Sequence, residues 1–317
     1  MGVRPNAHYT KRWEKGNKID DIVPEHPQNQ NQNCAPTPRA SPPALWRCAQ
    51  AFSLIELLVV IAIIAILAAV LFPVLAAAKA RGQEAACLNN LREFAGAFLV
   101  YADDNGGKFV DNEPLGQMPS VSNNWTLGNM AIPTQCTNAG LLERGELFPY
   151  TTQVPLYHCP ADVWQTNGAM HVRSYAMNSW VGSRSMETGI AAGYGMSGVT
   201  QEANYQTFKI ENETAIMGAS TLWIFADENE VNLNAPWWLV TMDDSQPFAS
   251  FPALRHSLGY NLSFADGHAE RWALRDTNTI SAAAGLIDTY VPPITSRNSD
   301  WVRLKQASTR RLGPALQ

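Results

Sequence analysis

The chain has 317 residues, which is enough for one sizeable domain with additional segments, and its formal net charge is −5 at pH 7. An acidic chain without a stripe of Lys and Arg is not typical of nucleic-acid-binding proteins, so we expect no nucleic acid partner. The apolar residues are concentrated in one run, and the remainder predicts a soluble body rich in tryptophan.

The first fifty residues are poor in aliphatic side chains and rich in Pro, Asn and Gln. Such a segment cannot bury enough apolar surface to offset the entropy lost on ordering, so we predict that it is disordered. It is also much longer than the positively charged region of an ordinary secretory signal. A start site placed too far upstream is the alternative interpretation.

A continuous apolar run from Leu57 to Phe72 predicts a membrane-spanning helix. The run resumes after Pro73 and reaches Ala78, so it supplies the roughly 20 residues that a helix needs to cross a bilayer. The core of a signal peptide has only about 7–15 apolar residues. Basic residues flank the run on both sides, and the positive-inside rule therefore does not decide its orientation.

Two residues are unusual in this segment. Glu56 stands at its front edge, although hydrocarbon disfavours an unpartnered acid. Pro73 lacks the N–H of a helical hydrogen bond and collides with the preceding turn, which predicts a kink or local melting. Both positions therefore need an explanation beyond membrane anchoring.

Beyond Ala78 the apolar residues follow helical spacing, which indicates an amphipathic continuation of the helix. The stripe consists of Cys87, Leu88, Leu91, Phe94, Ala95, Phe98, Leu99 and Ala102. We expect this face to pack on the soluble body until the glycine-rich residues 103–107 end the helix. A helix from Phe52 to about Ala102 would be roughly 75 Å long.

The rest of the chain predicts strands and loops. Short apolar or alternating runs occur at 221–227, 237–242 and 260–274, separated by Gly, Pro and Asn. Asp266-Gly267 is a preferred dipeptide of two-residue hairpin turns, so we expect an antiparallel hairpin there. Residues 180–215 look rich in loops, and 292–317 look like a frayed tail. Most of the tryptophans are expected in the core. The predicted fold class is α+β, with a long N-terminal helix packed on an antiparallel sheet that carries large loops.

The start of the apolar run resembles the processing and assembly motif of type IV pilins and type II secretion pseudopilins. In that family a small residue, usually Gly, precedes the cut, and Phe, a small or hydroxyl residue, two aliphatic residues and Glu follow it. The corresponding residues here are Ala51, Phe52, Ser53, Leu54, Ile55 and Glu56. Pro73 falls where the family commonly has a proline, and Ala51 departs from the usual glycine.

The body carries a second resemblance. His256, nine further residues and Asp266-Gly267 match the H-x9-DG motif of a subgroup of pilin-like proteins. Residues 157–162 and 174–178 also resemble that subgroup.

The resemblance implies a prepilin that is cut between Ala51 and Phe52 by prepilin peptidase and methylated on the new amine of Phe52. It implies a cleaved cytoplasmic leader at 1–51, a transmembrane and assembly helix at 52–104, and a β-rich head at 105–317. The mature protein is expected in the inner (cytoplasmic) membrane as a single-pass protein, with its head periplasmic or, after assembly, extracellular. The implied partners are the lipid bilayer, the peptidase, an inner-membrane assembly platform and other pilin-like subunits of a filament.

Glu56 and Pro73 acquire roles under this resemblance. Glu56 can pair with the Phe52 ammonium of a neighbouring subunit, and Pro73 can bend the helix so that it packs beside its neighbours. Two simpler interpretations stay open. Glu56 can be an acid that reaches water at the membrane edge, and transmembrane helices tolerate proline.

A metal site in the head is a further hypothesis. Its candidate ligands are His256, Asp266 and His268, with Asp227 and Glu228, because imidazole and carboxylate groups bind divalent metals. Their spacing is not a recognised ligand motif, and the hairpin turn already explains Asp266. We therefore favour structural hydrogen bonding and expect no cofactor.

Cys136 and Cys159 are disulfide candidates if the head lies in an oxidising compartment, with Cys87 as a competing partner for either. The sequence contains no nucleophile elbow, phosphate loop or zinc-protease helix, so we do not expect an enzyme. The predicted role is that of a structural filament subunit in protein secretion or a pilus. A membrane-tethered ligand- or carbohydrate-binding module and a tethered metal-dependent enzyme are the alternatives.

Overall fold

The computed structural model describes residues 53–114, 123–166, 168–183, 185–186, 204–242, 250–285 and 298–313. The predicted disordered leader and half of the predicted loop at 180–215 lie outside these ranges.

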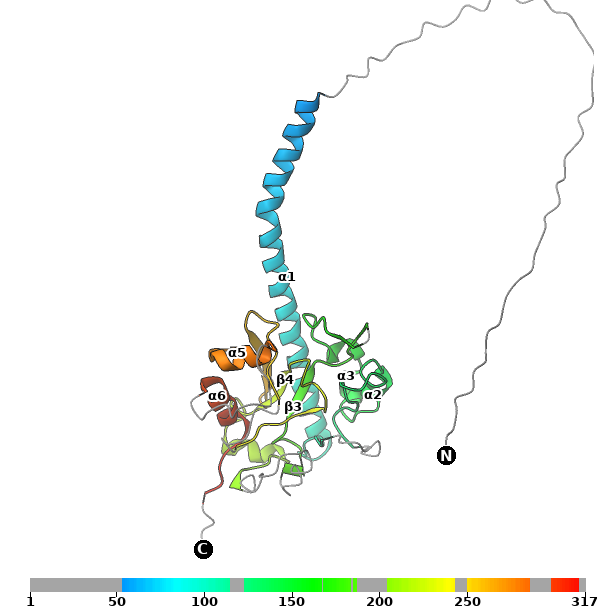
Figure 1. Ribbon diagram of the computed structural model, residues 1–317. Coiled ribbons are helices and arrows are strands. Elements are labelled where there is room, and N and C mark those ends of the chain that lie inside the picture. The colour runs from blue at the N-terminus through cyan, green and yellow to red at the C-terminus, as the bar shows by residue number, and fades with distance from the viewer. Residues whose placement is uncertain are drawn as a thin grey trace, which may run out of the picture. The chain divides into compact units, whose positions relative to one another are not determined.

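One long helix, α1, opens the described chain. It is continuous from Leu54 to Asp104, including Pro73, so the predicted local melting at this proline does not occur. Instead the helix follows a curved path (Figure 1). At about 1.5 Å per residue, 51 residues correspond to a length of about 77 Å. The predicted long N-terminal helix is confirmed.

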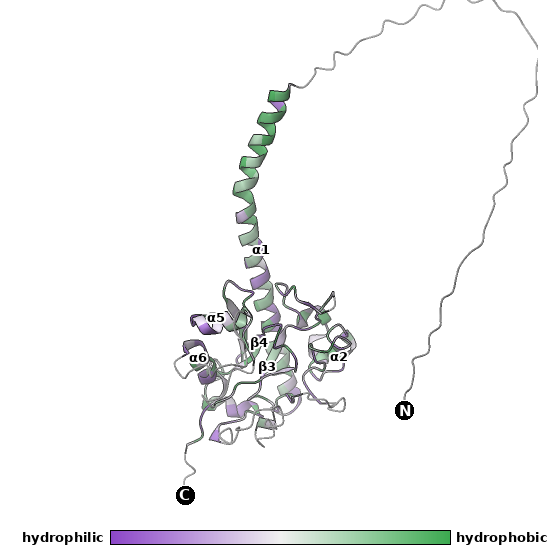
Figure 2. Ribbon diagram, in the orientation of Figure 1, coloured by the Kyte–Doolittle hydropathy of each residue, from purple (hydrophilic) through white to green (hydrophobic). Residues whose placement is uncertain are grey.

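The first half of α1 exposes its apolar side chains. From Leu58 to Gly82 every residue except the half-buried Ala68 is exposed. Figure 2 shows the front part of this stretch as almost uniformly hydrophobic, and the basic residues Lys79 and Arg81 stand near its end. No residue in the most apolar part of the helix is buried. The segment is long and apolar enough to cross a membrane, in agreement with the prediction.

The second half of α1 buries one face in the head. The buried residues are Cys87, Leu91, Phe94, Ala95, Ala97, Phe98 and Ala102, close to the predicted stripe. Phe94 is fully buried, and its ring centroid lies 4.8 Å from that of Tyr157 and 5.2 Å from that of Phe225. The helix therefore supplies part of the core of the head.

The head contains a five-stranded sheet with the order β5-β3-β4-β6-β7. The strands are β3 (Tyr175–Asn178), β4 (Trp223–Asp227), β5 (Trp237–Trp238), β6 (Gly259–Phe264) and β7 (Ala269–Ala273). All neighbouring pairs are antiparallel except β3 and β5, which are parallel. The sheet is therefore mixed, because the chain between β4 and β5 returns to run beside β3 in the same direction.

Both faces of this sheet are covered, and every residue of β3, β4 and β6 is buried. Side chains of Tyr175, Met177 and Phe225 join the buried face of α1 in one core cluster. A second cluster contains strand residues such as Ala176 and Leu262 together with residues of α5 (Thr277–Ala283) and α6 (Ser299–Ser308). Alternate residues of a strand point to opposite faces, so the sheet lies between two cores.

The predicted hairpin is formed by β6 and β7, but its turn is longer than expected. The Phe264 N–H donates to the carbonyl of His268 at 2.9 Å, and the Gly267 N–H donates to the carbonyl of Phe264 at 3.0 Å. Three residues, Ala265 to Gly267, therefore form the connection. Gly267 has a φ of +91°, which suits the last position of a three-residue loop.

The C-terminal region differs from the predicted frayed tail. Asn298 caps α6 by accepting hydrogen bonds from the N–H groups of Asp300 and Trp301. Trp301 and Leu304 of this helix are buried against the sheet. Most other tryptophans also lie in the core as predicted, although Trp164 is 43% exposed.

The remaining described elements are short. They are α2 (Ala139–Glu143), α3 (Phe148–Thr151), η1 (Val154–Tyr157), η4 (Glu211–Ile216) and a small hairpin of β1 (Gln165–Thr166) and β2 (Ala169–Met170).

Candidate functional site: the assembly segment and a buried polar cluster

The front edge of α1 is organised by Glu56. Ser53 directly precedes the helix, and its N–H donates a hydrogen bond of 2.9 Å to Glu56 Oε2. The spacing S-x-x-E is that of a capping box, in which the acid in the first turn satisfies a backbone N–H that lacks a helical partner. A negative charge in the first turn also interacts favourably with the helix dipole. This contact was not predicted, although the spacing is visible in the sequence.

The cleavage position itself lies outside the described residues, since these begin at Ser53. The assembly segment can nevertheless be followed from Ser53 onward. It consists of the capped helix start, then the exposed apolar half of α1 and, within that half, Pro73. An apolar surface of this extent is not stable in water, and it requires a bilayer or neighbouring helices.

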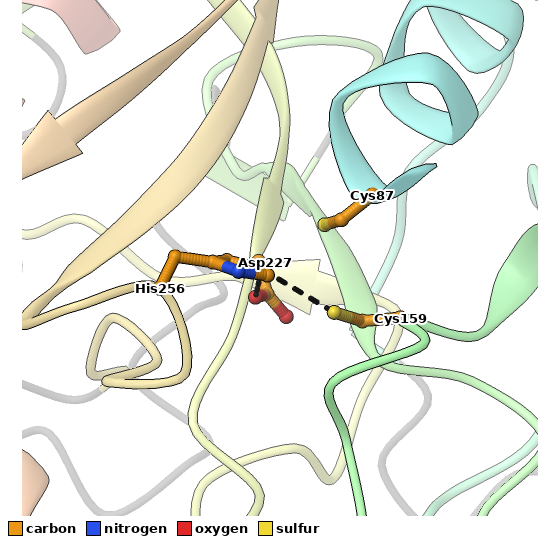
Figure 3. Close-up of side chains that lie close together, drawn as sticks. All are labelled: Cys87, Cys159, Asp227 and His256. Atoms are coloured by element: carbon orange, nitrogen blue, oxygen red, sulfur yellow. Dashed lines mark hydrogen bonds and ion pairs between the residues drawn. The ribbon is translucent and has the colours of Figure 1, made fainter. Parts of the chain in front are cut away.

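A second arrangement lies inside the head, where four side chains form a buried polar cluster: Cys87, Cys159, Asp227 and His256. Figure 3 shows Cys87 on α1 opposite the other three side chains. Cys159 follows η1, Asp227 ends β4, and His256 precedes β6. The potential ligand atoms all lie within 4.8 Å of one another.

His256 is at the centre of the contacts in this cluster. Its Nε2 lies 3.4 Å from Cys159 Sγ and 3.2 Å from Asp227 Oδ2. Burial alone lowers the pKa of His256, but the interactions with Asp227 and Cys159 outweigh it and raise the pKa to about 9. The contact with Cys87 and burial raise the pKa of the Cys159 thiol. The Cys159 thiol therefore stays protonated beside the imidazolium of His256.

Arg255 supports the cluster from the side of Asp227. Its guanidinium binds Asp227 Oδ1, and it also lies 3.2 Å from Asp162 Oδ2 and 3.0 Å from Glu230 Oε2. Burial lowers the pKa of Arg255, whereas the carboxylates raise it, and the net shift is upward. The Ser174 hydroxyl links the two parts, because it donates to Asp162 Oδ2 at 2.7 Å and accepts from the Cys159 N–H at 3.0 Å.

Comparison with known families identifies the assembly segment. Residues 46–72 match the family described as the prokaryotic N-terminal methylation motif. The chain is type IV pilin-like. The motif implies processing by prepilin peptidase and assembly with other pilin subunits, and the apolar half of α1 fits a single-pass membrane-anchored protein. No curated protein and no solved structure matches the chain.

The head of this pilin-like protein brings together only some of the candidate metal ligands that the sequence suggested. His256 and Asp227 are neighbours, whereas Asp266 and His268 pair with each other at the β6–β7 turn, with 2.5 Å between Asp266 Oδ1 and His268 Nδ1. Both side chains of this second pair are more than a third exposed. Partial burial raises the pKa of Asp266, but its hydrogen bonds with His268 outweigh this and lower it. The Asp-Gly part of H-x9-DG therefore shapes the turn.

Glu228 was also a candidate metal ligand, and it is buried next to the cluster. Burial raises the pKa of its carboxyl. Its backbone carbonyl, not its carboxylate, accepts a hydrogen bond from Arg255 at 2.9 Å.

The disulfide candidates Cys87, Cys136 and Cys159 are all free thiols in this structure. Cys136 packs with Met130 and Leu233 in a separate small cluster. Cys159 instead faces Cys87, which the sequence had indicated only as a competing partner. Neither cysteine was predicted as a neighbour of His256.

Proposed function

We propose that this pilin-like protein is a pseudopilin-type structural subunit of a type II secretion or type IV pilus-like filament. Prepilin peptidase cuts between Ala51 and Phe52 and methylates the Phe52 amine. The mature chain is anchored in the inner membrane by α1, with its head on the periplasmic side. We also assign the chain to the H-x9-DG subgroup, on the basis of His256 and Asp266-Gly267.

The observation that carries this proposal is that one helix has both the methylation motif and a long exposed apolar surface. The methylation motif covers the start of α1, and the helix exposes an almost unbroken apolar surface as far as Ala78. A simple anchor needs the apolar length but not the motif. A helix with both features can leave the bilayer only if neighbouring helices cover the same surface.

Glu56 fits the same role. In the single chain its carboxylate accepts the Ser53 N–H, so it is held at the level of the helix start. Cleavage creates an ammonium group at Phe52, immediately before that N–H. A carboxylate in hydrocarbon is costly without a partner, and an ammonium from an adjacent subunit supplies one.

We propose no catalytic activity. Among the described residues, the grouping of Cys, His and Asp side chains that most resembles a catalytic site is the buried polar cluster, where His256 is 2% exposed and the other three residues are fully buried. A substrate cannot reach a thiol in that position without opening of the head.

Assembly is tested with a pair of substitutions in α1. Glu56→Ala is expected to remain in the membrane but to disappear from the sheared filament fraction, because the ammonium of the neighbouring subunit loses its partner. Glu93→Ala is the matched control, since Glu93 is exposed on α1 and accepts a local hydrogen bond from the Asn89 side chain. Immunoblots of both fractions measure the outcome. Equal recovery of Glu56→Ala and Glu93→Ala in filaments, or absence of the unmodified chain from them, would contradict the proposal.

A further inference from the structure

The buried polar cluster has the composition of a metal-binding site. Two thiols, one imidazole and one carboxylate converge from four separate parts of the head, and their ligand atoms lie within 4.8 Å of one another (Figure 3). We propose that Cys87, Cys159, Asp227 and His256 bind one zinc ion. This site goes beyond the role of a filament subunit and does not depend on cleavage at Phe52.

Two of the distances between ligand atoms agree with a tetrahedral zinc site, and all of them lie within 4.8 Å. Zinc binds sulfur at about 2.3 Å and nitrogen or oxygen at about 2.0–2.2 Å, so tetrahedral ligands lie about 3.5 Å apart for a sulfur–nitrogen pair and about 3.3 Å apart for a nitrogen–oxygen pair. His256 Nε2 is 3.4 Å from Cys159 Sγ and 3.2 Å from Asp227 Oδ2. Thiolate ligands favour zinc over magnesium or calcium, which prefer oxygen.

The hydrogen bonds of the cluster are incomplete without a cation. His256 Nε2 carries at most one proton, yet it faces both Cys159 Sγ and Asp227 Oδ2. Asp227 Oδ2 is buried, and among the described residues its contact is the ion pair with His256 Nε2 at 3.2 Å, which is not a well-formed hydrogen bond. A buried carboxylate oxygen in this state is costly. One zinc ion engages this oxygen, both sulfurs and the imidazole together.

The surrounding residues orient the ligands as outer-shell groups do in metal sites. Arg255 binds Asp227 Oδ1 and so leaves Oδ2 directed toward the cluster. The Tyr175 hydroxyl donates to Cys87 Sγ at 3.3 Å, and the Cys159 N–H is fixed by Ser174. These contacts hold three of the four ligands from outside.

Zinc binding releases protons from the ligands and involves no change of oxidation state. Each thiol releases its proton to solvent, His256 binds through a deprotonated Nε2, and zinc accepts one electron pair from each of the four ligands. Four protein ligands close the coordination sphere, which is typical of a structural site. The ion thus connects Cys87 of α1 with the sheet and fastens the head to the assembly helix.

The test uses the full chain, solubilised in detergent and reduced. The protein is titrated with zinc chloride, passed through a desalting column and analysed by elemental mass spectrometry. We expect one zinc per chain, and loss of this zinc in Cys159→Ser. Cys136→Ser is the matched control, because Cys136 is equally buried but packs in the separate cluster with Met130. It is expected to retain the zinc.

A second measurement does not depend on the folding of the variants. Cobalt(II) added to the unmodified chain is expected to give the intense visible bands of tetrahedral coordination and a thiolate-to-cobalt charge-transfer band. Three results would each overturn the proposal: no more zinc on the reduced chain than on Cys159→Ser, a cobalt spectrum without thiolate ligation, or a Cys87–Cys159 disulfide in peptides of unreduced protein recovered from membranes.

Discussion

Arg255 is the cation between three acidic side chains of the head. Its buried guanidinium contacts the carboxylates of Asp162, Asp227 and Glu230, two of which are themselves buried. Buried acids brought together in this way repel one another unless a cation lies between them. The upward shift in the pKa of Arg255 reflects the same attraction.

Removal of this charge is expected to destabilise the head strongly. We expect Arg255→Met to lower the free energy of unfolding by about 3–5 kcal/mol, because it leaves buried carboxylates without their partner. Arg92→Met is the control on the exposed face of α1, where a change within about 0.5 kcal/mol is expected. Urea unfolding of the solubilised chain, followed by tryptophan fluorescence, gives both values. If Arg255→Met lowered the free energy of unfolding as little as Arg92→Met, the buried carboxylates would not depend on Arg255 for their stability.

The sequence indicated some residues of the buried polar cluster, but it did not indicate that they lie together. His256 and Asp227 were proposed as ligands from their chemistry, and Asp266 was correctly assigned to the turn. Cys87 and Cys159 were not connected with His256, because the cluster joins four elements and no spacing rule relates residues 97 positions apart, as Cys159 and His256 are. Such a site follows only from the tertiary fold.

At the scale of elements, α1 has two halves with different partners. Its exposed half requires lipid or other helices, while its buried half completes the core of the head through Phe94 and its neighbours. Phe94 stacks edge-to-face on Trp125, Tyr157 and Tyr175. The helix therefore contributes to the stability of the head as well as to anchoring.

Substitutions in the two halves are expected to have different effects on unfolding. Phe94→Ala removes a fully buried ring and is expected to cost about 3–5 kcal/mol. Leu75→Ala, at an exposed position of the same helix, is expected to change the stability of the head by no more than about 0.5 kcal/mol. Chemical unfolding in the same detergent compares them. A cost of Leu75→Ala similar to that of Phe94→Ala would contradict this division.

The elements that the sequence predicted well are those with local signals. The helix α1 and the β6–β7 hairpin follow from periodicity and a turn dipeptide. Helix α6 was missed because its apolar residues, Trp301 and Leu304, stand among polar ones and become a helical face only against the sheet. The parallel pairing of β3 and β5 was missed for a related reason, since it depends on the path of the intervening chain.

At the scale of the whole molecule, the chain combines a head with cores on both faces of its sheet and a helix segment whose apolar surface has no partner within the chain's described residues. The head needs no neighbour to bury its core. The apolar half of α1 does, and under the proposed function this neighbour is first the bilayer and then another subunit.

If the chain is a prepilin, cleavage before Phe52 places α1 at the N-terminus of the mature protein. Mass analysis of the N-terminal peptide, from protein recovered from membranes of cells that contain prepilin peptidase, tests it most directly. Cells without the peptidase provide the control and are expected to yield the uncut chain. The account predicts a mature chain that begins at N-methylated Phe52. An intact leader in the presence of the peptidase, or a cut at another position, would contradict it.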